Sequence, residues 1–193
     1  MDEKLYKTLV RIAIGITLIW VGWGMYDGFL EESVPGAHSV QAAAKLLEDG
    51  QNEDALKEYE SQLKDNPDNV YALRGKAQAL MQMGKSDLAL NIYNDAISRE
   101  KDFGVTYANR GILRDRMGDH QGALADYEMA LKLAPETAEG PGMMTRFLRK
   151  QADKPPTIAE RAIYLREQLA KPESERVLKV QEQDAKQRPY KMD

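Results

Sequence analysis

The chain has 193 residues, of which 27 are Lys or Arg and 31 are Asp or Glu, for a formal net charge of -4. This balance argues against a nucleic-acid-binding protein, because such proteins use a net basic face to displace counterions from phosphates. The chain has no Cys and only two His, which excludes disulfides, iron–sulfur clusters and thiolate chemistry, and leaves zinc without its usual ligands. The length allows one modest domain with appendages.

The N-terminal segment is predicted to cross a membrane. Residues 12–26, IAIGITLIWVGWGMY, are 15 consecutive residues without a charge. At 1.5 Å per residue they span about 22 Å, short of the roughly 30 Å hydrocarbon core. A helix over residues 9–30 is long enough, since Arg11 and Asp27 can reach the headgroups and the two Trp suit the interface. We expect a single span that contacts the lipid bilayer through residues 9–30.

The basic residues near this span predict its orientation. Lys4, Lys7 and Arg11 precede it, whereas the next basic residue after it is Lys45. The positive-inside rule then puts residues 1–8 in the cytoplasm and everything after the span on the other side. We therefore expect a single-pass protein of the bacterial inner (cytoplasmic) membrane with its main domain in the periplasm.

Two other interpretations of the segment stay open. A basic start and an apolar run also describe a cleavable signal peptide, but the only small-x-small triplet after the run, residues 37–39, lies about a dozen residues too far downstream. A buried core helix fits less well, because an uncharged run with two Trp at the N-terminus suits a bilayer better than a small core.

A period of 34 residues runs through residues 36–137. Its invariant columns are Gly50, Gly84 and Gly118; Ala55, Ala89 and Ala123; Leu56, Leu90 and Leu124; and Tyr59, Tyr93 and Tyr127. A second set of columns is small, at Ala43, Ala77 and Gly111, and Pro67 and Pro135 close two of the copies. This pattern resembles the tetratricopeptide repeat (TPR). The resemblance implies an all-α fold, a TPR helical-hairpin solenoid with three repeats over residues 39–137, preceded by one N-terminal transmembrane helix.

Each column has a physical reason. Small residues let two antiparallel helices approach closely, and each recurring Tyr can fill the gap between one hairpin and the next. The central Gly stands where the first helix ends, because a left-handed cap is most easily formed by Gly. Pro67 and Pro135 are expected to end the second helices.

The segments around the repeats have their own patterns. Residues 31–38 read as a short linker, and residues 138–152 as a capping helix that covers the last apolar face. Residues 153–193 are expected to form C-terminal helices and a tail. In this region Thr157 and Glu160 form a capping box, and the apolar stripe of residues 158–169 must pack on the repeats or on another protein. Residues 173–187 are expected to form a further helix in a detached or partner-bound tail.

The sequence carries no motif for catalysis. It has no phosphate-binding glycine loop, nucleophile elbow, HExxH or CxxC, so we expect no enzyme activity, no cofactor and no metal. Glu48, Asp49, Glu53 and Asp54 lack the spacing of a calcium loop and are expected to form a solvated face. His120 is expected to be exposed in a turn between helices, and His38 in the linker.

The resemblance places a peptide-binding groove on the first helices of the repeats. The groove candidates are Tyr71, Arg74, Gln78, Met81, Gln82, Ala108, Asn109, Ile112, Asp115 and Arg116. Arg74, Gln78 and Asn109 also resemble part of the clamp by which some TPR domains bind a terminal carboxylate. The other half of that clamp is missing, since Glu139 and Met143 stand at its positions.

The resemblance implies partners that are other proteins. We expect a membrane-anchored TPR adaptor or assembly factor that binds exported proteins or membrane-complex subunits on the non-cytoplasmic face. The alternative is an accessory structural subunit of a respiratory or photosynthetic membrane complex, docked through its C-terminal helices. The stripe of residues 158–169 motivates this second hypothesis.

Overall fold

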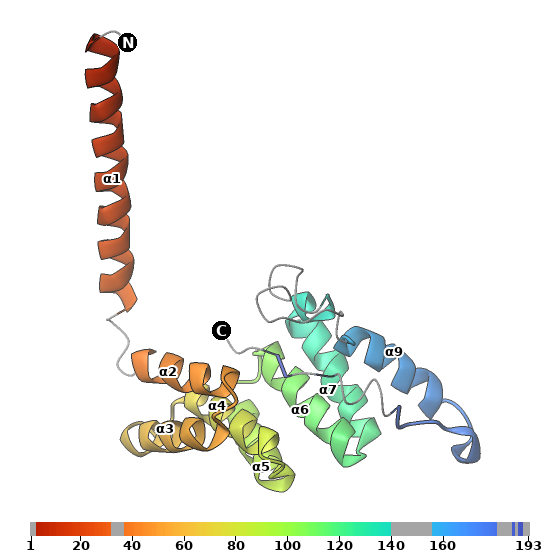
Figure 1. Cartoon of the computed structure of the whole chain (residues 1–193). Helices are drawn as coiled ribbons and strands as arrows, with labels where there is room; N and C mark the ends of the chain where they lie inside the picture. Colours follow the sequence, from red (N-terminus) through yellow and green to blue (C-terminus); the bar gives the residue numbers. More distant parts are fainter. Residues whose placement is uncertain (1–2, 32–36, 140–155, 181–186, 188, 191–193) are drawn as a thin grey trace.

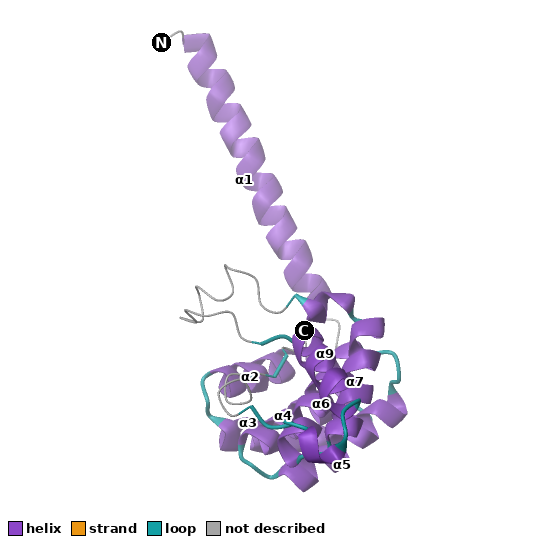
Figure 2. Cartoon of the chain, turned by 90° about the vertical axis from the view of Figure 1, so that its right-hand side faces the viewer, coloured by secondary structure: helices purple, strands orange, loops and turns teal. Residues whose placement is uncertain are grey.

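The computed structural model describes residues 3–31, 37–139, 156–180, 187 and 189–190, and no strand is present among them. The helices form one slender N-terminal rod and a stack of hairpins (Figure 1, Figure 2). The elements are α1 (Glu3–Glu31), α2 (Ala37–Glu48), α3 (Asn52–Asp65), α4 (Val70–Gln82), α5 (Ser86–Arg99), α6 (Gly104–Met117), α7 (His120–Leu133), the 3-10 helix η1 (Pro135–Ala138), α9 (Ile158–Leu169) and the 3-10 helix η2 (Glu173–Glu175). The all-α fold predicted from the repeat is confirmed.

Three helical hairpins follow one another along the chain: α2 with α3, α4 with α5, and α6 with α7. The first helix of each ends on a Gly in the left-handed region, with φ of 77° at Gly50, 74° at Gly84 and 89° at Gly118. The residue after each Gly donates its N–H back across the last turn, as Asp119 does to the carbonyl of Arg114 at 2.9 Å. The second helices α3 and α7 end before Pro67 and Pro135, as predicted.

Tyrosines fill the space between successive helices. Tyr59, Tyr93 and Tyr127 are all buried, in agreement with their predicted role. Gly75 and Gly111 are required by this packing, because a Cβ on Gly75 would lie 2.1 Å from the ring of Tyr59 and one on Gly111 would lie 2.7 Å from the ring of Tyr127. Gly75 and Gly111, which stand in different columns of the repeat, thus let the rings of Tyr59 and Tyr127 lie directly against helix backbone.

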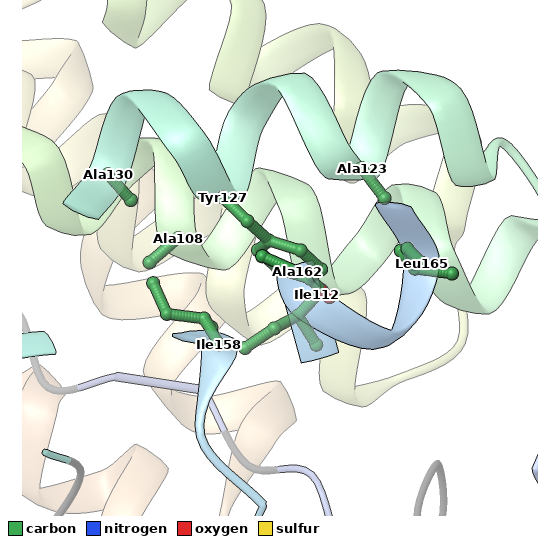
Figure 3. Packing of buried hydrophobic residues seen from close by; sticks show 8 residues of the cluster. All are labelled: Ala108, Ile112, Ala123, Tyr127, Ala130, Ile158, Ala162 and Leu165. Carbon is green, nitrogen blue, oxygen red and sulfur yellow. The ribbon is translucent and has the colours of Figure 1, made fainter. Parts of the chain in front are cut away.

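Helix α9 packs where the first helix of a fourth repeat would lie. It contacts α7 and η1, and its apolar side chains Ile158, Ala162 and Leu165 are buried against the third hairpin (Figure 3). Fully burying an Ile or Leu contributes about 1.5–3 kcal/mol, so this contact stabilises the end of the array. The helix begins at the predicted capping box of Thr157 and Glu160. The apolar stripe therefore packs on the repeats of the same chain.

The C-terminal region also departs from expectation. The predicted capping helix of residues 138–152 lies mostly outside the described residues. Helix α9 covers the last hairpin. The expected helix over residues 173–187 is wrong in its described part, because η2 is short and residues 176–180 are not helical. Side chains of α9 bind this backbone: Gln168 accepts the N–H of Val177 at 3.0 Å, and Tyr164 donates to its carbonyl at 2.7 Å. Backbone groups bound in this way are not available for a helix.

Candidate functional site

The predicted groove residues lie on the first helices of the second and third hairpins, α4 and α6. Asn69 caps α4 by accepting the N–H of Ala72 at 3.1 Å. Helix α6 ends at the left-handed Gly118. These two caps fix where α4 begins and where α6 ends.

On α4, the predicted residues divide between surface and core. Tyr71 is 51% exposed and Gln82 is exposed, whereas Gln78 is half-buried. Met81 is buried in a cluster with Leu80 and Leu113, so its side chain serves packing. Of the candidates on α4, Tyr71 and Gln82 are accessible to a partner.

Arg74 is fully buried and its charge is compensated inside the chain. It forms an ion pair with Glu100, and its guanidinium lies 3.8 Å from the ring centroid of Phe103 and 5.4 Å from that of Tyr71. Its Nε and Nη1 have no hydrogen-bond partner among the described residues. The aromatic faces therefore provide part of the stabilisation that a buried cation requires. Because Arg74 already binds a carboxylate of its own chain, it is not an open donor for a carboxylate clamp.

On α6, Ile112 and Asp115 are buried by contacts with α9. Ile112, like Ala108, packs in the cluster of Ile158 and Leu165. Asp115 accepts two hydrogen bonds from Arg161, at 2.6 Å from Nε and 2.9 Å from Nη2. Both side chains are almost inaccessible, with 3% exposure for Asp115 and 4% for Arg161. Such a bidentate pair joins α9 to α6 with a fixed geometry.

The prediction that His120 is exposed is wrong. Its ring is buried, and Nδ1 lies 2.8 Å from Asp115 Oδ1. Tyr127 also donates its hydroxyl to Asp115 Oδ2, at 3.3 Å. One buried carboxylate thus connects α6, α7 and α9, and it needs these donors because an unpaired buried charge is strongly unfavourable.

Asn109 and Arg116 bind the end of the chain. Asn109 Nδ2 donates to the carbonyl of Tyr190 at 3.0 Å, and the N–H of Tyr190 donates to Asn109 Oδ1 at 2.7 Å. Arg116 donates to the carbonyl of Gln187 at 2.8 Å. We call α9, Gln187 and Tyr190 together the cover of α6. The tail, predicted to be detached or bound to a partner, is in these residues bound to the repeats.

Burial shifts the pKa of the tyrosines in the array. It raises the pKa of Tyr59 to about 12 and raises that of Tyr93 further. The pKa of Tyr127 also rises well above its usual value, first through burial and then through the nearby carboxylate of Asp115. These hydroxyls stay protonated near neutral pH. Among the described residues, no three His, Asp or Glu side chains come together in a way that could hold a metal ion.

Comparison with known proteins decides the family. Models of the tetratricopeptide repeat match residues 46–107 and 105–137. The chain is a TPR protein. The solved structure of Naa15/Naa10 bound to HypK-THB has the same fold over 71% of this chain and 18% of that chain, with a TM-score of 0.54 and 23% identity.

Curated relatives match the repeats. DnaJ homolog subfamily C member 3 of Mus musculus is 32% identical over 100 residues, which are 52% of this chain and 20% of that protein. The tetratricopeptide repeat and J domain-containing co-chaperone DNJ1 of Fusarium oxysporum is 28% identical over 106 residues, which are 55% and 20% of the two chains. This TPR chain therefore spans about a fifth of the length of these relatives.

Sequence reasoning missed Arg161, Gln187 and Tyr190 as residues of this face. One signal in the repeat pointed to a missing partner for Asp115. The column that contains Leu47 and Met81 has Asp115 in the third copy. A carboxylate in a column that is otherwise apolar and buried requires a donor from elsewhere in the chain.

Proposed function

We propose that this TPR protein is anchored in the bacterial inner membrane by α1 and binds other proteins on the non-cytoplasmic face, as an adaptor or assembly factor without catalytic activity. TPR proteins mediate protein–protein interactions, and one of the relatives is named a co-chaperone. Binding rather than catalysis is therefore the role that the family supports. To this role the proposal adds the anchoring by α1, the bacterial inner membrane and the non-cytoplasmic face.

The apolar surface of α1 is the observation that carries the proposal. The window Tyr6–Trp23 is the one stretch of the described residues that is long and apolar enough to cross a membrane, and it is 0% buried. Its exposed side chains include Leu18 at 66%, Ile19 at 72% and Trp20 at 80%. A large contiguous apolar surface is unfavourable in water and favourable in a bilayer. Figure 1 shows α1 extending away from the hairpins, where it can insert without disturbing them.

The alternative of docking through the C-terminal helices has lost its motivation. It rested on the stripe of residues 158–169, whose Ile158, Ala162 and Leu165 are buried on the third hairpin. The exposed apolar residue on this helix is Ile163. The stripe therefore gives no reason to infer a second protein at this place.

Single cysteines test the anchor and its orientation, because the chain has no Cys of its own. Lys4→Cys and Lys85→Cys both place a thiol at an exposed position. In intact spheroplasts, a membrane-impermeant maleimide should label Lys85→Cys, and Lys4→Cys only after lysis. The reverse pattern would contradict the orientation, and recovery of the protein in the soluble fraction would contradict the anchor.

A photo-crosslinking amino acid tests partner binding on the inner face of the array, the side formed by the first helices of the repeats. Tyr71 on α4 and Leu88 on α5 are matched sites, since they are 51% and 56% exposed but lie on the first and second helix of one hairpin. We expect defined protein adducts from position 71 and few from position 88. Equal adducts from both positions would contradict a role for the inner face.

A further inference from the structure

The third hairpin binds the backbone of Gln187 and Tyr190. Asn109 forms a reciprocal pair with the N–H and carbonyl of Tyr190, and Arg116 binds the carbonyl of Gln187. Asn109 is fully buried, so its amide has no access to water and both of its hydrogen bonds depend on this backbone. Donors and acceptors aimed at backbone groups are what an extended peptide requires.

The spacing of the two helix residues matches an extended occupant. Asn109 and Arg116 are seven residues apart on α6, which corresponds to about 10 Å along the helix. Pro189 lies between Gln187 and Tyr190 and favours the extended polyproline II conformation, in which three residues advance about 9 Å. In that conformation residues three apart lie on the same side. Both carbonyls can therefore meet α6 at once, with the segment antiparallel to the helix.

Two side chains of the segment are bound as well. Gln187 is 3% exposed, and its Nε2 donates to the hydroxyl of Tyr127 at 3.1 Å. Tyr190 packs against the cluster of Ile112 and Ile158, and its hydroxyl donates to the carbonyl of Thr137 at 2.8 Å. The chain thus forms one subsite for an amide, at Tyr127, and one for a phenol, at Ile112, Ile158 and Thr137. The two side chains that fill these subsites are three residues apart.

We propose that the face of α6 is a binding site for extended segments that carry Gln and Tyr three residues apart, and that Gln187 and Tyr190 are its resident occupants. A partner segment of this chemistry binds by replacing them. This inference rests on the proposed protein-binding function for its biological use, and it names the partner chemistry and the regulation of one face. The occupant in the same chain acts as a competitor whose release opens the face.

Tethering makes this competitor strong. A segment attached by a short linker has an effective concentration of about 1 mM. When the tail segment has an intrinsic Kd of about 10 µM for the face, a partner segment binds about 100-fold more weakly while the tail is in place. The face of α6 is therefore closed to weak segments and open to strong or concentrated ones.

A peptide supplied in trans tests the proposal on the full-length protein in detergent. The probe is a fluorescein-labelled peptide of residues 181–193, QEQDAKQRPYKMD, followed by anisotropy. We expect the variant Gln187→Ala with Tyr190→Ala to bind this peptide at least 30-fold more tightly than the unchanged protein. A peptide with the same two replacements should not bind, and adding Asn109→Ala to the protein should abolish binding. Asn91→Ala, at an exposed Asn on α5, is the matched control for Asn109→Ala and should have no effect.

The outcomes separate this inference from the proposed function. If the double variant keeps its helical circular dichroism but does not bind the peptide, the site is refuted, whereas the cysteine labelling reports on the anchor independently. If the double variant unfolds, Gln187→Ala alone replaces it, because it keeps the side chain of Tyr190 packed against Ile112 and Ile158. We then expect at least fivefold tighter peptide binding than in the unchanged protein, and equal binding refutes the proposal.

Discussion

The second and third repeats have the same scaffold and different inner faces. Both carry the left-handed Gly cap, the invariant Ala of the second helix and the buried Tyr, and both form hairpins of nearly equal length. Their inner columns differ, with Gln78 and Met81 on α4 and Ile112 and Asp115 on α6. The face of α6 is bound by the cover, whereas α4 keeps Tyr71 and Gln82 exposed.

This difference separates two kinds of position in a repeat. Residues between the two helices of a hairpin specify the scaffold, because every copy must solve the same packing problem. Residues on the inner face of the first helix specify what binds there, because the neighbours that they contact differ from one repeat to the next. Substitutions in the inner columns should therefore change the cover and leave the scaffold intact.

The largest effect is expected from the ion pair that joins α9 to α6. Arg161 and Arg166 are both on α9, but Arg161 binds the buried Asp115 and Arg166 binds the exposed Glu128. We expect Arg161→Ala to lower the free energy of unfolding by about 3–5 kcal/mol, because it leaves Asp115 buried without this partner. Arg166→Ala should change it by less than about 1 kcal/mol. Urea unfolding followed by circular dichroism measures both, and similar losses would show that the cover does not depend on Asp115.

A smaller effect is expected in the scaffold of the second repeat. A methyl group on Gly75 would overlap the ring of Tyr59. Overpacking of this kind is unfavourable by about 1–3 kcal/mol, while Ala gains up to about 1 kcal/mol over Gly in helix propensity. We expect a net loss of about 1–2 kcal/mol for Gly75→Ala in thermal unfolding. Gly22→Ala on α1, where a Cβ meets nothing within 4 Å, is the control and should not lower the stability of the hairpins.

The smallest effect per side chain is expected from alkaline pH. Burial raises the pKa of Tyr59 to about 12 and raises the pKa of Tyr93 and Tyr127, whereas an unfolded Tyr titrates near about 10. As the pH rises, the unfolded chain loses these protons first. The stability is therefore fully present below about pH 10 and falls above it, by about 1 kcal/mol per buried Tyr between pH 10 and 11.

The variant Tyr93→Phe isolates one of these protons. The hydroxyl of Tyr93 has no partner among the described residues, whereas that of Tyr127 binds Asp115 and Gln187. Tyr93→Phe should keep the stability at pH 8 and reduce the alkaline loss in urea unfolding. An unchanged alkaline slope would mean that Tyr93 already ionises in the folded protein.

The repeat predicted the scaffold well because its contacts are local. The helices, the three left-handed Gly caps and the buried tyrosines all follow from the 34-residue period and from side-chain size. The burial of His120 and the docking of Tyr190 did not follow, and the stripe of α9 left its partner open between the repeats and another protein. They depend on pairs with no repeated counterpart, and Asp115 in an apolar column predicts that a donor exists without saying that it is Arg161.

The peptide-binding role of the groove candidates stays a prediction, and the structure changes its basis. Of the three residues proposed for a carboxylate clamp, Arg74 binds Glu100 and Asn109 binds Tyr190. The groups that Arg74 and Asn109 bind come from the chain itself. A sequence reports which donors are present and cannot report that distant residues of the same chain already use them.

The sequence distances across the cover have a consequence for folding. Arg110 and Asp126 within the third hairpin are 16 residues apart, whereas Asp115 and Arg161 are 46 apart and Asn109 and Tyr190 are 81 apart. Closing a longer loop loses more entropy, so the hairpins form before the cover. During synthesis at about 5–20 residues per second, α6 leaves the ribosome about 2–9 s before Arg161 does. For that interval every new molecule presents the face of α6 uncovered, and a segment that binds early meets no competitor.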